Sequence, residues 1–261
     1  MATFILIHGG NIPAETWNRL TGRNTYPPGM LLGGKVWEGT KAFLESCGHR
    51  VFAPELPDEH THTLTDHIDS VCSLICTSDM HMVILVGHSY GGMVITGVAA
   101  RVPRRIRRLI YVDGALPDPG ESLFDQFDLG GVDPLSFAGL EPAAAYVEKI
   151  RFDSRKVRGI PKTYALCAKS EFAMVTRVAK RKLEAQGGGV ILNCRRPMSR
   201  WRQCPGGFTG LWECSHNPEL QYSGARGPPF FQIFCENFCA VIIPEPVLLW
   251  EAGPVPAVTG G

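Results

Sequence analysis

A serine flanked by glycines in the first half of the chain has the spacing of a catalytic nucleophile. The residues read Gly87-His88-Ser89-Tyr90-Gly91, after an apolar run and before a segment of helical period. A sharp strand-to-helix turn leaves no room for side chains beside such a serine, which explains the glycines. The turn sets the Tyr90 backbone N–H at the positive end of a helix, where an oxyanion is stabilised. The pattern predicts a serine nucleophile for acyl transfer.

A glycine turn after the first apolar run could support the same chemistry. It reads His8-Gly9-Gly10-Asn11, and its backbone can donate a second N–H to the oxyanion. Many strands end in a glycine turn, so this motif gains meaning from the serine turn that accompanies it. We predict an oxyanion hole built from the N–H groups of Gly10 and Tyr90.

Parallel strands joined by helices are predicted to position these two turns. Short apolar runs alternate with helix-period segments from residue 1 to about residue 192, which is typical of an α/β domain with a mostly parallel sheet and flanking helices. A helix is expected from Tyr90 to the residue before Pro103, and another carries an apolar stripe of Leu64, Ile68, Val71 and Ile75. The predicted strands cover residues 3–8, 50–53, 82–86, 109–112 and 163–167, with a weaker one at 190–192.

Two connections are longer than usual, namely residues 11–34 and 116–161. We interpret the second as a small cap over the site. Several apolar side chains in these segments either line a pocket or pack against the domain, and the sequence leaves both readings open. They are Leu123, Phe124, Phe127 and Leu129 in the cap, and Trp17 and Trp37 near the first connection.

Composition narrows the class of protein. The 261 residues are 44% hydrophobic and carry a net charge of +1, which fits one domain and gives no field to attract nucleic acid or an anionic membrane. No apolar run approaches the roughly 20 residues that span a bilayer, and the apolar start resembles a strand rather than a signal peptide. We therefore expect a cytoplasmic protein with nine reduced cysteines, no nucleic-acid or membrane partner, and a small neutral ligand. The sequence carries no signal for an oligomeric state.

Histidines gather near acidic residues at positions 58–67. His60, His62 and His67 could suggest a metal cluster with Asp58, Glu59 and Asp66. A polar loop leading into a helix explains the same residues, and we favour that interpretation. His88 lies inside the serine turn, where its side chain is expected to point away from the Ser89 hydroxyl.

Four stretches resemble one branch of the α/β-hydrolase superfamily. They are residues 4–10, Gly48-His49-Arg50-Val51, the serine turn, and Tyr111-Val112-Asp113-Gly114-Ala115-Leu116-Pro117. The branch contains plant salicylate methylesterases, hydroxynitrile lyases and many bacterial esterases, and the resemblance covers roughly residues 3–185. It implies the α/β-hydrolase fold, a cap between the later strands, a Ser-His-acid triad and no cofactor.

The triad acid has two candidates. The family places this acid after the strand at 163–167, which makes Glu171 the first candidate, and Asp113 after the preceding strand is the second. Chain order in this fold runs Ser, acid, His, and only His216 follows Glu171. The family's histidine falls roughly 25 to 30 residues beyond the acid, where this chain reads Arg196-Pro197-Met198-Ser199-Arg200.

The C-terminal quarter differs in composition from the rest of the chain. After about Gly189, cysteine, proline and tryptophan become more frequent and periodicity fades. Common codons for residues 193–204, read one base out of register, allow the peptide ELPTSHVPMATM, which resembles the family's usual ending with its triad histidine. We hypothesise that the segment from about 190 to 261 is a frameshifted reading of an ordinary hydrolase gene. Activity would then be weak or absent, unless His216 folds back beside Ser89.

Three functions follow from this reading. The favoured one is a carboxylesterase that cleaves a small-molecule ester through an acyl-serine intermediate. A hydroxynitrile lyase that uses the serine as a base is the second. The third is a ligand-binding protein on a hydrolase scaffold that lacks its triad histidine.

Overall fold

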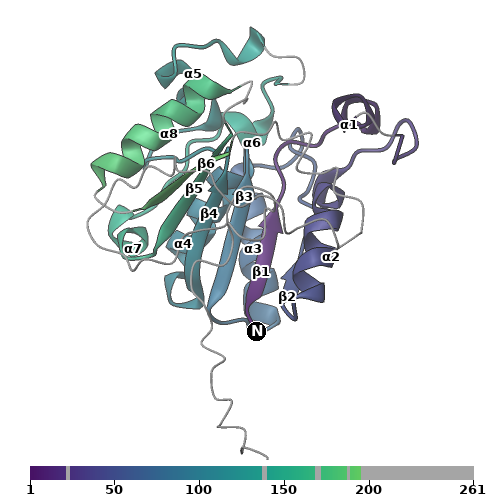
Figure 1. The fold of residues 1–261 in the computed structure, drawn as a ribbon. Coiled ribbons are helices and arrows are strands. Elements are labelled where there is room, and N and C mark those ends of the chain that lie inside the picture. The colour runs from purple at the N-terminus through teal and green to yellow at the C-terminus, as the bar shows by residue number, and fades with distance from the viewer. Residues whose placement is uncertain (22–23, 137–139, 168–171, 187–188, 195–261) are drawn as a thin grey trace, which may run out of the picture.

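A six-stranded parallel sheet forms the centre of the protein (Figure 1). The computed structural model describes residues 1–21, 24–136, 140–167, 172–186 and 189–194. The strand order is β2-β1-β3-β4-β5-β6, and every neighbouring pair is parallel. The strands are β1 (Thr3–Ile7), β2 (Arg50–Phe52), β3 (Val83–His88), β4 (Ile106–Val112), β5 (Lys162–Cys167) and β6 (Val190–Cys194).

Both faces of the sheet are buried, which is why the central strands are continuous apolar runs. Successive side chains of a strand point to opposite faces. In β1, Phe4 and Leu6 pack in the same cluster as Leu44, whereas Ile5 and Ile7 belong to a larger cluster on the other face. The predicted helical stripe of Leu64, Ile68, Val71 and Ile75 lies in that larger cluster.

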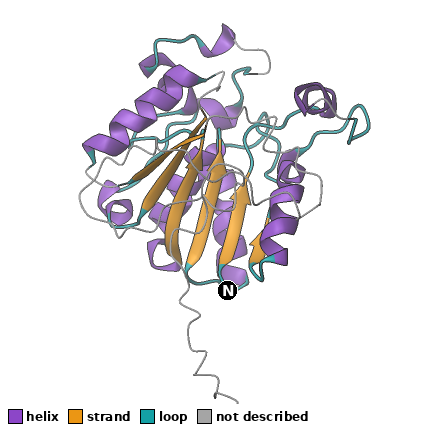
Figure 2. Ribbon diagram, viewed as in Figure 1, coloured by secondary structure: helices purple, strands orange, loops and turns teal. Residues whose placement is uncertain are grey.

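Helices flank the sheet on both sides (Figure 2). The helix that follows β2 begins at a capping box, in which the Thr63 side chain accepts from the Asp66 N–H and the Asp66 carboxylate accepts from the Thr63 N–H. The described helices are α1 (Ala14–Thr21), α2 (Glu38–Ser46), α3 (Leu64–Thr77), α4 (Gly91–Arg101), α5 (Leu123–Leu129), α6 (Ala144–Val147), α7 (Ser154–Arg158) and α8 (Ala173–Ala185), with short 3₁₀ turns η1 (Gly33–Trp37), η2 (Pro103–Arg105) and η3 (Pro134–Ser136).

The predicted α/β-hydrolase architecture, a parallel sheet with flanking helices, is confirmed, with shifts at the ends of strands. β3 runs on through Gly87 and His88, so the serine turn begins inside the strand, and β4 begins at Ile106 rather than at residue 109. The first long connection holds α1, which the sequence did not predict. Trp17 and Trp37 are both buried, so they pack against the domain rather than line an open pocket.

The connection between β4 and β5, residues 113–161, carries the short helices α5, α6 and α7. We call it the β4–β5 segment. Near the start of this segment, two carboxylates form ion pairs with Lys182 of α8. Asp118 lies 3.2 Å from the Lys182 Nζ, and the Glu121 carboxylate also contacts it. This half-buried ion cluster holds the start of the segment against α8.

The edge strand β6 includes the first residues of the unusual C-terminal composition. β6 pairs in register with β5 from Val190 to Cys194, so the change in composition after Gly189 begins within a strand of the sheet.

Glu171 and His216, two of the predicted catalytic residues, lie outside the described residues. None of the helices in the described ranges has both the length and the apolar character needed to cross a membrane.

Candidate active site

Ser89 lies at the carboxyl end of β3, one residue before the N-cap of α4. Its φ is +52°, a left-handed conformation that is costly for a residue with a side chain. The Ser89 carbonyl accepts N–H groups from Gly92 at 3.0 Å and Ala115 at 2.9 Å. The helix and the chain after β4 therefore hold Ser89 in its strained turn from two sides, as predicted for a nucleophile elbow.

The loop after β1 passes so close to Ser89 that only glycine fits. A Cβ on Gly9 would lie 3.0 Å from the Ser89 Cβ and 3.4 Å from the Ser89 Oγ. From the other direction, a Cβ on Gly91 would come within 2.7 Å of the backbone oxygens of Ile7 and His8. The doubled glycine of the first turn was the available signal for Gly9, to which the sequence pattern assigned no role of its own.

Asp113 occupies the matching position on the neighbouring strand. It follows β4 directly, its side chain is 8% exposed, and its N–H donates to the Ala165 carbonyl at 2.9 Å. Its φ is +47°, so it shares the strained conformation of Ser89. Among the described residues four non-glycines have a positive φ, and these two line the same pocket at the carboxyl edge of the sheet.

This pocket, which we call the Ser89 pocket, is lined by polar and apolar side chains together. Ser89, Asp113 and Ala115 form one side, and Phe172, Val175 and Thr176 contribute from the start of α8. Of the four apolar residues singled out in α5, Leu123 and Phe127 line the pocket. Phe124 packs against the core, and Leu129 is 52% exposed. The walls suit an apolar group next to the serine.

Tyr90 and Gly10, the two predicted oxyanion donors, are both covered by aromatic side chains. The Tyr90 ring is buried, its hydroxyl lies 2.9 Å from the His67 Nδ1, and its ring centre lies 5.0 Å from that of Tyr146. Burial raises the pKa of Tyr90, so its hydroxyl stays protonated. A Cβ on Gly10 would lie 2.3 Å from the Tyr146 hydroxyl oxygen. The donor role of the two N–H groups stays a prediction.

The histidines near the elbow have structural partners. His8 is buried, and its Nε2 accepts the Leu56 N–H at 3.1 Å while its Nδ1 lies 2.7 Å from the Gly9 carbonyl. Burial lowers its pKa, and the N–H that points at Nε2 favours the neutral ring. His88 lies against Trp37, with ring centres 6.4 Å apart. His67 is buried against Tyr90, whereas His60 and His62 are exposed.

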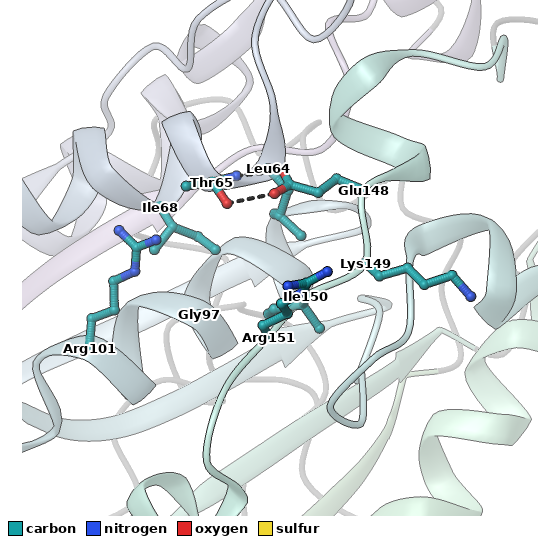
Figure 3. A pocket seen from close by; sticks show the side chains of 9 residues that line it. All are labelled: Leu64, Thr65, Ile68, Gly97, Arg101, Glu148, Lys149, Ile150 and Arg151. Atoms are coloured by element: carbon teal, nitrogen blue, oxygen red, sulfur yellow. Dashed lines mark hydrogen bonds between the residues drawn. The ribbon is translucent and has the colours of Figure 1, made fainter.

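A second pocket lies between α3, α4 and residues 148–151 of the β4–β5 segment (Figure 3). We call it the Thr65 pocket. Glu148 accepts the Thr65 N–H at 2.8 Å and its hydroxyl at 2.6 Å. Of its cations, Arg101 pairs with Asp69, and Lys149 lies 3.4 Å from Asp125. Glu148 therefore joins the β4–β5 segment to α3, while the two ion pairs link α4 to α3 and one part of the segment to another.

Comparison with known proteins places nearly all of the described residues in one family. A family model described as "Alpha/beta hydrolase family" matches residues 4–242. The chain is 39% identical over 132 residues to a carbendazim hydrolyzing esterase of Nocardioides sp. (strain SG-4G). This alignment covers 47% of this chain and 46% of that protein. It is 27% identical over 134 residues to polyneuridine aldehyde esterase of Rauvolfia serpentina, covering 48% of this chain and 43% of the relative.

Solved structures agree on the fold. An extracellular alpha/beta-hydrolase from a Paenibacillus species superposes with a TM-score of 0.51 at 22% identity, covering 75% of this chain and 90% of that one. At this identity the likeness concerns the fold alone. The sequence matches to the two curated esterases span less than half of their lengths.

Proposed function

The chain belongs to the alpha/beta hydrolase family, and from that premise we propose that it is a serine hydrolase that cleaves small carboxylic esters. The observation that carries the proposal is the strained Ser89 at the carboxyl edge of the sheet, in one pocket with Asp113. Two relatives are named as esterases, which supports ester cleavage as the reaction.

In the proposed reaction the Ser89 Oγ attacks the ester carbonyl carbon, and a histidine takes the serine proton. The carbonyl oxygen becomes an oxyanion, which accepts the N–H groups of Gly10 and Tyr90. The C–O bond to the leaving alcohol then breaks, and the histidine returns the proton to that alcohol. Water, deprotonated by the same histidine, releases the acid and regenerates Ser89.

Asp113 is our choice for the acid that orients the histidine. It is buried beside the Ser89 pocket at the end of the adjacent strand, and parallel strands bring their carboxyl ends to one edge of a sheet. Glu171, the first candidate from the sequence, lies outside the described residues. The histidine is either His216 or the one that the alternate reading frame would supply.

The acyl group is proposed to lie against Leu123, Phe127 and Val175. These side chains face the serine from α5 and α8 and offer no charge. An apolar acyl chain would exclude water from them, whereas a charged group would lose hydration without gaining a partner. We therefore propose neutral esters with a short apolar acyl group as substrates.

A fluorophosphonate probe tests the nucleophile directly, because it reacts with activated serines. We expect stoichiometric labelling of the folded protein and hydrolysis of p-nitrophenyl acetate, both abolished in Ser89→Ala. Ser46→Ala on the exposed end of α2 is the matched control and should label like the parent. Folded protein that neither labels nor hydrolyses short p-nitrophenyl esters would refute the esterase proposal.

A further inference from the structure

Glu59 is a carboxylate in the loop after β2 that is only 8% exposed. Its Oε1 accepts the Asn11 N–H at 2.9 Å and the Tyr146 hydroxyl at 3.1 Å, and its Oε2 accepts the Asn11 side-chain amide at 2.5 Å. Its backbone carbonyl also accepts the Ala145 N–H at 3.2 Å. One residue thus binds both the loop after β1 and helix α6.

The two partners of Glu59 lead to the two predicted oxyanion donors. Asn11 directly follows Gly10, so the carboxylate fixes the end of the turn that carries the Gly10 N–H. Tyr146 covers Gly10 with its hydroxyl and packs its ring edge-on against Tyr90, with ring centres 5.0 Å apart. A shift of either partner would therefore move one donor relative to the other.

We propose that Glu59 is a positioning residue that fixes the relative placement of the Gly10 and Tyr90 N–H groups through Asn11 and Tyr146. The inference rests on the proposed function, since it assumes that these groups bind an oxyanion. An oxyanion hole stabilises charge because its donors are held in place before the reaction, and an error of about 1 Å in such a site can cost roughly 10²-fold in rate. A carboxylate suits this role because charge-assisted hydrogen bonds are shorter and stronger than neutral ones.

The variants separate positioning from general stability. Glu59→Ala removes every side-chain bond and is expected to lower kcat for p-nitrophenyl acetate by roughly 10-fold to 100-fold with little change in KM. Glu59→Gln keeps one oxygen for the Asn11 N–H and the Tyr146 hydroxyl but loses the charge and the oxygen that accepts the Asn11 side-chain amide, so it should recover most, not all, of the kcat lost in Glu59→Ala. Tyr146→Phe removes one bond and should fall between the two. Asp58→Ala, at an exposed neighbouring carboxylate, is the matched control and should keep the parent kcat.

A second measurement keeps the inference distinct from the proposed function. Amide hydrogen exchange at Asn11 reports whether Glu59 holds its N–H, and it is expected to quicken in Glu59→Ala but not in Asp58→Ala. If Glu59→Ala keeps the parent kcat per folded molecule, or leaves exchange at Asn11 unchanged, the positioning role is wrong while Ser89 labelling still supports the esterase. If the parent fails to label but Asn11 exchange quickens in Glu59→Ala, the esterase proposal fails and the anchoring of the loop stands.

Discussion

The Ser89 pocket and the Thr65 pocket lie on the same domain but are built differently. The first is lined by two residues with positive φ, and glycines beside it allow backbone segments to touch. The second has ordinary backbone, charged side chains and hydrogen bonds between half-exposed or exposed groups. Strain that the surrounding structure enforces is characteristic of sites of chemistry, whereas satisfied surface charges mostly join elements. In this protein, backbone conformation distinguishes the two pockets more clearly than their charges do.

The largest expected effect concerns the histidine that would act as the general base. The described residues that line the Ser89 pocket include no histidine. We expect the gene to contain a compatible alternate frame across codons 185–205. A chain translated in that frame should label with fluorophosphonate roughly 10²-fold to 10⁴-fold faster than the present chain, which is the usual contribution of a general base. Sequencing the gene and comparing the two labelling rates measure this. A gene without such a frame ends the hypothesis.

Replacing Asp113 by Asn would test whether the second strained residue belongs to the chemistry. In the chain that carries the alternate-frame histidine, we expect the labelling rate of Ser89 to fall by up to the same factor, roughly 10²-fold to 10⁴-fold, because an amide cannot hold the histidine in its working tautomer or stabilise its charged form. The rate is measured by quenching the labelling reaction at successive times and quantifying the labelled protein by mass spectrometry. Asp128→Asn, an exposed change on α5, should leave it unchanged. An Asp113→Asn rate equal to the parent's would return the role to Glu171.

The close approach at the elbow predicts a large effect on stability. Gly91→Ala places a methyl group within 2.7 Å of backbone oxygens of β1, which cannot move like the end of a side chain. The free energy of unfolding is expected to fall by roughly 2 to 3 kcal/mol, as for other overpacked sites. Gly39→Ala, in α2 with nothing within 4 Å, is the control and should stabilise by about 0.5 to 1 kcal/mol. Equal stability of the two variants in urea would contradict the tight fit.

The sequence predicted the parts of this site that depend on local pattern. GxSxG between a strand and a helix identified Ser89, and the apolar runs identified the sheet that presents it, because both are governed by neighbours in the chain. The contacts of Glu59 could not be predicted in this way, because its partners are distant in the chain. Asn11 is 48 residues away from Glu59 and Tyr146 is 87 residues away. Gly9 was underestimated for the same reason, since its close neighbour Ser89 comes from another strand.

Acid should lower the free energy of unfolding because two histidines near Ser89 are buried. Burial lowers the pKa of His8 and of His67 below the ordinary value of 6.5, so the unfolded state binds more protons than the folded state below that pH. The free energy of unfolding therefore falls as the pH drops below 6.5, by up to about 1.4 kcal/mol per pH unit for each histidine. Urea unfolding at pH 7.5, 6.5 and 5.5 measures the slope. His67→Gln should reduce it and His62→Gln, an exposed change, should not.

The smallest expected effect belongs to the Thr65 pocket. Glu148→Gln weakens the two bonds to Thr65 near the N-terminus of α3, where a negative charge is favourable but exposed. We expect the free energy of unfolding to fall by about 0.5 to 1 kcal/mol, with the Ser89 labelling rate unchanged. Arg104→Gln, on the surface turn before β4, is a control for the loss of one charge. A labelling rate that fell with Glu148→Gln would show that the two pockets are coupled through the β4–β5 segment, because Glu148 and the pocket residues Leu123 and Phe127 share that segment.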